Sequence, residues 1–315
     1  MKLTTLFLPA IAALAIALPS AASSADRSLV VYTPSKGYLD LIVPAFEAET
    51  GIKVDMVAAG SGEILQRIKA EAAAPLGDAL VGMSNELLDD AKDNLEVPDG
   101  AGKPWPPFSR AVVGVFAVNE NALGNLPVPA SWEDLAKPIY RGKIAYAGAD
   151  KSGSAYEQLT LLLGVKGEEA GWKLFGRILP NLIVTNSSGA VVTGTGRGEY
   201  AIGITNEDAA YKLIVDGAPV KVIYPAEGVV VKNDGSALIK GGKHADEARL
   251  FFAYAARPAV QQVIVDRMFR RSPVPGVTLP KGLAAELPQA KIDPAAAATL
   301  DRDAVIRKYL ALIRS

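Results

Sequence analysis

The sequence predicts an α/β fold built around a parallel sheet with helices on both faces. Short apolar runs alternate with helical patterns along most of the chain, and this strand–helix–strand–helix order is typical of parallel sheets. The chain has no cysteine, so its stability must come from a hydrophobic core, which a chain of this length can supply. Length alone leaves open whether the core forms one large domain or two smaller ones.

The apolar runs and the 3.6-residue patterns place the individual elements. We expect strands over residues 29–32, 52–57, 111–118, 144–146, 182–184 and 200–204, and a strand-rich stretch over 220–231. We expect helices over 38–50, 154–163, 168–179, 246–257, 258–267 and 301–313, and one opened by Gly60. Pro44 kinks the first helix and Gly51 ends it. The strands near 110–118 and 220–224 are natural crossings between two lobes.

The first 25 residues have the layout of a secretory signal peptide. Lys2 supplies the positive start, residues 6–18 carry no charge, and small residues follow. The apolar run is shorter than the roughly 20 residues that a membrane span needs. Cleavage after Ala22 or after Ala25 satisfies the small-residue rule. We therefore expect residues 1–25 to be a signal peptide and the mature chain to be released into the periplasm, without a lipid anchor because it has no cysteine.

Charge and composition argue against several classes of function. The formal net charge is −1, and it becomes −2 when the single charge of the signal peptide, Lys2, is removed. No basic excess points to nucleic acid or to a membrane surface. One histidine and no cysteine argue against a zinc site of the usual N/S type. We expect no metal and no cofactor.

Several segments together resemble the solute-binding proteins of ABC importers, in the branch that holds ferric-ion, phosphonate and sugar-phosphate binders. The resemblance covers nearly the whole mature chain, in the expected order. The segments are Val31-Tyr32-Thr33-Pro34-Ser35, residues 44–54 and 60–71, Ser152-Gly153-Ser154-Ala155-Tyr156, residues 185–189 and 198–204, and Pro225-Ala226-Glu227-Gly228.

The resemblance implies a two-lobed periplasmic-binding-protein fold of type II, with the ligand in a cleft between lobes joined by two crossing strands. Lobe one would comprise residues 26–110 and 225–290, lobe two 111–224, and a C-terminal helical segment 291–315. The protein would be a monomer that is not an enzyme. It would capture a small anionic solute by hinge closure and deliver it to an inner-membrane ABC permease with a cytoplasmic ATPase.

Hydroxyl and glycine residues mark the turns where strands give way to helices. A helix N-terminus carries a partial positive charge and unpaired N–H groups, which suit phosphate, phosphonate or carboxylate. In open α/β sheets the ligand crevice lies at the carboxyl ends of the strands, where these turns fall. Each serine alone could instead be an ordinary helix cap. The candidate ligand-binding residues in these turns are Ser35; Gly60, Ser61 and Gly62; Ser152, Gly153 and Ser154; and Ser187, Ser188 and Gly189.

Three acidic residues complete the candidate site: Glu207, Asp208 and Glu227. They would repel a bare anion, so they fit a ligand whose other end carries hydroxyl groups or an amine. By resemblance, acidic residues in these loops contact sugar hydroxyls in hexose-phosphate binders. The ligand we expect is a hexose phosphate or 2-aminoethylphosphonate. Solvated loop carboxylates remain the alternative.

Two other functions stay open. Ferric-ion binders of this branch use two neighbouring tyrosines after the strand that here ends at Ile204, but this chain offers only Tyr211, with Glu207 and Asp208 nearby. Iron remains an alternative because these oxygens are hard ligands. An exported phosphate-ester hydrolase is the alternative from another class, and its acid–base groups would have to come from the same carboxylates.

Overall fold

The computed structural model describes residues 27–98, 105–292 and 300–314. The predicted signal peptide, residues 1–25, lies outside the described residues. Among the residues described, no helix combines the length and apolarity that crossing a membrane requires.

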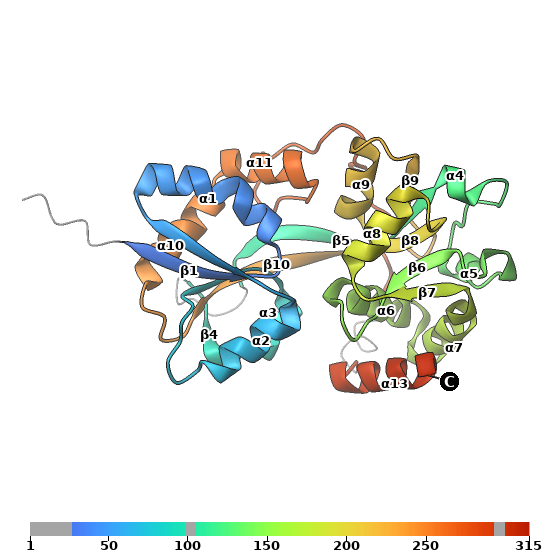
Figure 1. The fold of residues 1–315 in the computed structure, drawn as a ribbon, viewed down its shortest axis with the longest axis horizontal. Coiled ribbons are helices and arrows are strands. Elements are labelled where there is room, and N and C mark those ends of the chain that lie inside the picture. Colours follow the sequence, from blue (N-terminus) through green and yellow to red (C-terminus); the bar gives the residue numbers. More distant parts are fainter. Residues whose placement is uncertain (1–26, 99–104, 293–299, 315) are drawn as a thin grey trace, which may run out of the picture.

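Two lobes share one sheet, which confirms the predicted two-lobed α/β architecture (Figure 1). The strands run in the order β2-β1-β3-β10-β5-β8-β6-β7. The long strands β5 (Pro107–Asn119) and β10 (Val230–Ile239) pair antiparallel and pass from one lobe to the other.

The second crossing was predicted at residues 220–224, and this was wrong. Those residues form β9 (Val220–Ile223), which pairs with the end of β5 inside lobe two. The crossing strand is β10, which pairs with β5 at one end and with β3 in lobe one at the other. Its polar residues Lys232, Asn233 and Asp234 interrupt the apolar pattern. Hydrophobicity alone therefore favoured the shorter apolar run at residues 220–224 as the crossing strand.

In lobe one, β1 (Ser28–Thr33) pairs in parallel with β2 (Lys53–Ala58) and β3 (Ala79–Ser84). Successive side chains of a strand point to opposite faces, so Leu29 and Val31 join one core cluster and Tyr32 joins another. The first cluster lies under α1 (Lys36–Thr50), α10 (Ala245–Ala255) and α11 (Pro258–Met268). The second lies under α2 (Ser61–Ala70) and α3 (Asn85–Asp90), beside the short strand β4 (Leu95–Glu96). As predicted, α1 contains Pro44 and ends at Gly51, whose φ of 70° is left-handed.

Lobe two carries the parallel strands β6 (Ile144–Ala147), β7 (Leu182–Thr185) and β8 (Ile202–Asn206). Its larger helices are α6 (Gly153–Lys166), α7 (Glu168–Ile178), α8 (Ser188–Arg197) and α9 (Glu207–Val215). Two short helices, α4 (Glu120–Leu123) and α5 (Trp132–Leu135), lie in the connection from β5 to β6. The carboxyl ends of β6, β7 and β8 therefore lead into α6, α8 and α9, which positions three helix N-termini at one sheet edge.

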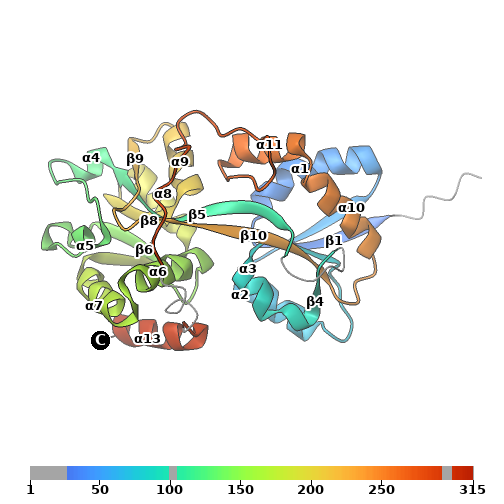
Figure 2. The same cartoon turned by 180° about the vertical axis from the view of Figure 1, so that it is seen from behind.

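The C-terminal helix α13 (Arg302–Arg314) lies beside α6 and α7 (Figure 2). Its Val305 and Tyr309 are buried in the core of lobe two, where the Tyr309 and Phe175 ring centroids are 6.0 Å apart. Leu287 also packs on lobe two, and Gln289 bridges to Val229. The predicted lobe limits, 26–110 with 225–290, 111–224 and 291–315, stay a prediction. We propose that the division instead falls within β5 and β10 and that residues near 287 belong to lobe two.

We predict that Leu39→Ala lowers the free energy of unfolding by about 2–5 kcal/mol, because the Leu39 side chain is fully buried against the sheet of lobe one and its removal leaves a cavity. Leu250→Ala, at a position 47% exposed on α10, is the matched control. It should change the free energy of unfolding by no more than about 0.5 kcal/mol. Urea denaturation measures both. Equal losses would contradict the placement of α1 in the core.

Candidate functional site

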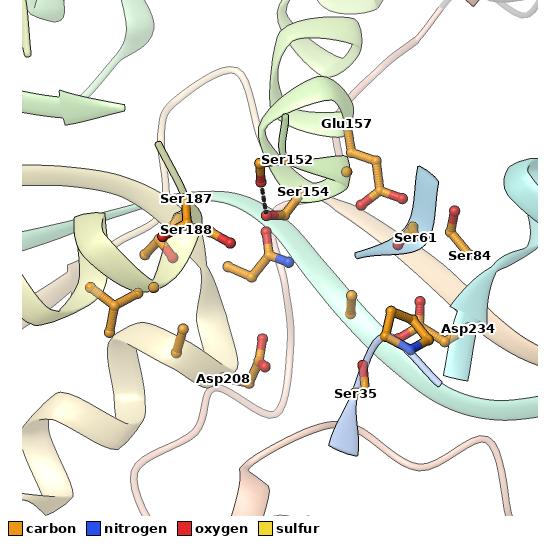
Figure 3. Close-up of a pocket in the computed structure, with 18 of the residues that line it drawn as sticks. Ser35, Ser61, Ser84, Ser152, Ser154, Glu157, Ser187, Ser188, Asp208 and Asp234 are labelled. Carbon is orange, nitrogen blue, oxygen red and sulfur yellow. Dashed lines mark hydrogen bonds between the residues drawn. The ribbon is translucent and has the colours of Figure 1, made fainter. Parts of the chain in front are cut away.

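A cavity of about 550 Å³ lies between the lobes, and both lobes and the crossing strands line it (Figure 3). Lobe one contributes the turn after β1, the start of α2 and the end of β3. Lobe two contributes the starts of α6, α8 and α9, and the crossing strands contribute Ala111 and Asp234. The cavity thus lies at the carboxyl ends of the parallel strands, as expected for an open α/β sheet.

The structure brings ten of the thirteen candidate residues to this cavity: Ser35, Gly60, Ser61, Ser152, Gly153, Ser154, Ser187, Ser188, Gly189 and Asp208. The other three, Gly62, Glu207 and Glu227, do not line it. Gly62 is exposed in the first turn of α2, one residue beyond Ser61.

In lobe two, serine hydroxyls do cap helices. Ser152 Oγ accepts a hydrogen bond from the Ala155 amide at 3.3 Å, and Ser187 Oγ accepts one from the Ala190 amide at 3.2 Å. Ser152 and Ser154 Oγ lie 3.1 Å apart. A hydroxyl that accepts a capping bond still has its own proton to donate. Capping and ligand binding are therefore compatible at these positions.

In lobe one, the serine and glycine turns have no side-chain caps. Ser35 and Gly60 are the N-cap residues of α1 and α2, and neither has a side-chain capping bond. A Cβ added at Gly153 would lie 3.8 Å from Ser61 Oγ. The starts of α2 and α6, from opposite lobes, thus approach closely across the cavity.

Glu207, predicted to bind ligand, lies outside the cavity lining and is engaged by other residues of the protein. It is buried and accepts two hydrogen bonds from Arg271, from Nε and Nη2 at 2.8 Å each, and a third from the Tyr224 hydroxyl. Arg271 also pairs through its backbone with Arg110 on β5. Burial and the Glu207 carboxylate raise the pKa of Tyr224 well above its usual range. Glu207 therefore ties lobe two to the segment after α11.

Glu227 is likewise engaged away from the cavity lining. It accepts a hydrogen bond from the Trp132 amide at 3.1 Å and pairs with Lys166 Nζ at 3.0 Å. Both partners belong to lobe two, so the carboxylate holds the loop before β10 against α5 and α6.

Asp208 does line the cavity, beside two residues that the sequence did not reveal. Arg270 lies 3.1 Å from Asp208 and 3.4 Å from Asp234, and it also donates to the Tyr38 hydroxyl. Burial raises the pKa of Asp234 even though Arg270 lies beside it. Arg270 Nη1 and Asp208 Oδ1 are buried without a hydrogen-bond partner among the described residues.

Glu157, Lys151, Lys212 and Ser84 also line the cavity and were missed. Glu157 follows Ser154 by three residues on α6, and this helical spacing is the signal that could have found it. Burial raises its pKa to about 7. Among the residues described, no group of three His, Cys, Asp or Glu side chains is placed to hold a metal ion.

Two known proteins are similar in sequence to most of this chain. The phosphoglycerate transport regulatory protein PgtC of Salmonella typhimurium is 26% identical over 253 residues, covering 76% of this chain but only 57% of its own length. The Fe(3+)-binding periplasmic protein of Serratia marcescens is 26% identical over 274 residues, covering 79% of each chain.

Solved structures show the same fold. The periplasmic binding protein AfuA from Actinobacillus pleuropneumoniae, solved with fructose-6-phosphate bound, has a TM-score of 0.80 at 24% identity and covers 91% of this chain and 98% of that one. Residues 61–305 match the family model of the bacterial extracellular solute-binding proteins. Because this match spans most of the chain, the protein belongs to that family, and it is a periplasmic solute-binding protein of the ABC-importer type.

Proposed function

We propose that this protein captures a small phosphorylated or phosphonate organic anion between its lobes and delivers it to an ABC permease. The observation that carries the proposal is the convergence of serine- and glycine-containing helix starts from both lobes on one cavity. Ser61 comes from lobe one, and Ser152 and Ser188 come from lobe two.

Several such donors together supply the affinity that a transport protein needs. A hydrogen bond to a charged group contributes about 1.5–3 kcal/mol, and micromolar binding requires about 8 kcal/mol net of the costs of association. Donors on both lobes bind the anion best when the cleft is closed, so the ligand stabilises the closed form over the open one. The close approach of Gly153 to Ser61 is the arrangement that such closure requires.

The remaining polar groups of the cavity suit the other end of an organic ligand. Asp208 and Arg270 present an acceptor and a donor without partners among the described residues, and a hydroxyl can satisfy both. PgtC is named as a phosphoglycerate transport regulatory protein, and AfuA was solved with fructose-6-phosphate bound; both compounds are hydroxylated phosphates. They support a hexose phosphate or related compound, with 2-aminoethylphosphonate as the other member of the class.

Ferric iron is the second candidate, because a relative of equal identity is an Fe(3+)-binding protein. The position of Tyr211 argues against ferric-iron binding. The Tyr211 hydroxyl donates to the Lys281 carbonyl, its ring packs on Phe269 with centroids 5.0 Å apart, and it does not line the cavity. Iron loading followed by visible spectroscopy tests this alternative, because tyrosine–iron complexes are coloured.

The similar proteins are binding proteins rather than enzymes, and we propose the same for this chain. Incubation with phosphorylated sugars and an assay for inorganic phosphate separates the two classes. Unaltered ligand is the expected result, and catalytic release of phosphate would establish a hydrolase.

We predict that at least one compound among hexose phosphates, 3-phosphoglycerate and 2-aminoethylphosphonate raises the melting temperature, because a ligand that binds only the folded state stabilises it. A ligand at 100 times its Kd adds about 2.7 kcal/mol to the free energy of unfolding. Differential scanning fluorimetry measures this, with the corresponding unphosphorylated compounds as controls. A shift with ferric salts alone would replace the proposal with iron binding.

Ser61→Ala should weaken binding of the compound so identified by about ten- to a hundredfold, because it removes one hydrogen bond to a charged group. Unliganded stability should not change, since Ser61 makes no capping bond. Ser131→Ala is the matched control, for which the opposite effects on stability and on binding are expected. Ser131 caps α5 away from the cavity, so its loss should cost about 1 kcal/mol of stability and leave binding intact. Calorimetry measures ligand binding by both variants. If Ser61→Ala bound the compound as tightly as the wild type, the proposed site would be refuted.

A further inference from the structure

Glu157 occupies a position in the cleft that the proposed function does not yet explain. It lies on α6, one turn beyond the Ser152–Ser154 start, and its side chain points into the cavity near Ser61 and Ser84 of the other lobe (Figure 3). A carboxylate at this place faces the same space as the helix starts that are proposed to hold an anion.

The Glu157 carboxylate has no partner of its own in the part of the chain that the structure describes. Among the described residues, no hydrogen bond reaches its oxygens, and no cation lies within 4.0 Å to form an ion pair. The two cations that act on it are paired elsewhere. Lys232 on β10 lies 2.8 Å from Glu86 of α3, and Arg270 pairs with Asp208 and Asp234. Lys151, which also lines the cavity, donates to Asn186.

Burial, rather than the surrounding charges, favours the neutral form of Glu157. Burial acts most strongly, and the carboxylates of Asp234 on β10 and Glu86 on α3 act in the same direction, against Lys232 and Arg270. Together these raise the Glu157 pKa to about 7. A half-buried acid without a partner lowers its free energy by taking up a proton rather than by keeping its charge.

We propose that Glu157 contacts the bound anion as a neutral carboxylic acid, so that ligand binding at alkaline pH takes up one proton from solvent. This inference rests on the proposed function. An ionised Glu157 would repel a phosphate or phosphonate, whereas the protonated form offers an O–H donor to an oxygen that can only accept. Glu157 thereby selects for acceptor-only anions and contributes a donor from α6 that opposes the Ser61 turn of lobe one.

The sign of the pH dependence follows from this assignment. Below pH 7 free Glu157 is already protonated, and binding needs no proton from this group. Above pH 7 it is ionised in the free protein and must be protonated on binding, so the affinity attributable to it falls by about tenfold for each pH unit.

The test is isothermal titration calorimetry of the wild type and Glu157→Gln in buffers of different ionisation enthalpy, at pH 5.5 and pH 8. The probes are glucose 6-phosphate, 3-phosphoglycerate, 2-aminoethylphosphonate and inorganic phosphate. The amide of Glu157→Gln is neutral at both pH values, and comparison of the two proteins cancels the titration of the probe itself. At pH 8 the wild type should take up about one proton more than Glu157→Gln, and at pH 5.5 about the same number.

Glu157→Gln should also bind at pH 8 at least as tightly as the wild type. Glu63→Gln, an exposed carboxylate on α2 outside the cavity, is the matched control and should keep the proton uptake of the wild type. Equal proton counts in the wild type and Glu157→Gln would overturn this inference and leave the proposed function standing. So would a Glu157→Gln that binds 2-aminoethylphosphonate far more weakly than the wild type, since that result assigns an ionised Glu157 to an ammonium group. Failure of every probe to bind the wild type would overturn both.

Discussion

The antiparallel pairing of β5 with β10 is the constraint on which the rest of the structure depends. These two strands join the lobes within one sheet, and Ala111 of β5 and Asp234 of β10 line the cavity. Arg271, after α11, pairs through its backbone with Arg110 of β5 and through its side chain with Glu207 of α9. The crossing strands therefore set the distance between the helix starts of the two lobes, and a ligand in the cavity lies between residues of both lobes.

Two adjacent acidic residues and two adjacent arginines lie near this crossing, and the two acid–arginine pairs differ in how completely their hydrogen bonds are satisfied. Glu207 and Arg271 form a buried, bidentate pair, further satisfied by Tyr224. Buried charges are tolerated when their hydrogen bonds are complete, which suits a structural role. Asp208 and Arg270 leave one buried atom each without a partner among the described residues. Such incomplete satisfaction is costly in a core and is expected where a ligand completes the network. Neighbours in sequence thus have different roles because the start of α9 turns one side chain away from the cavity and the other toward it.

The serine turns could be predicted because their position depends on local structure. Ser61, Ser152 and Ser187 each follow a strand and open a helix, and the carboxyl ends of parallel strands meet at one edge of the sheet. Glu227 could not be placed in this way, because its partner Lys166 is 61 residues away in the chain. Arg270 and Asp234 were missed for the same reason: they reach the cavity only because α11 and β10 fold back onto lobe one. The Ser187 turn was predicted to open a helix, but the extent of that helix, α8, was not predicted because three glycines, at 189, 194 and 196, weaken its helical signal.

The sequence by itself determined the α/β class, most strands and helices, the family resemblance and the polar turns, because periodicity, helix starts and turn residues act over a few positions. Only the tertiary structure decided that β10 rather than β9 crosses between the lobes, that Glu207 and Glu227 form ion pairs outside the cavity lining, and that Glu157 faces the cavity without a partner among the described residues. These outcomes depend on pairing and charge between residues far apart in the chain. A carboxylate's environment, and hence its pKa and role, exists only once those distant residues are packed around it.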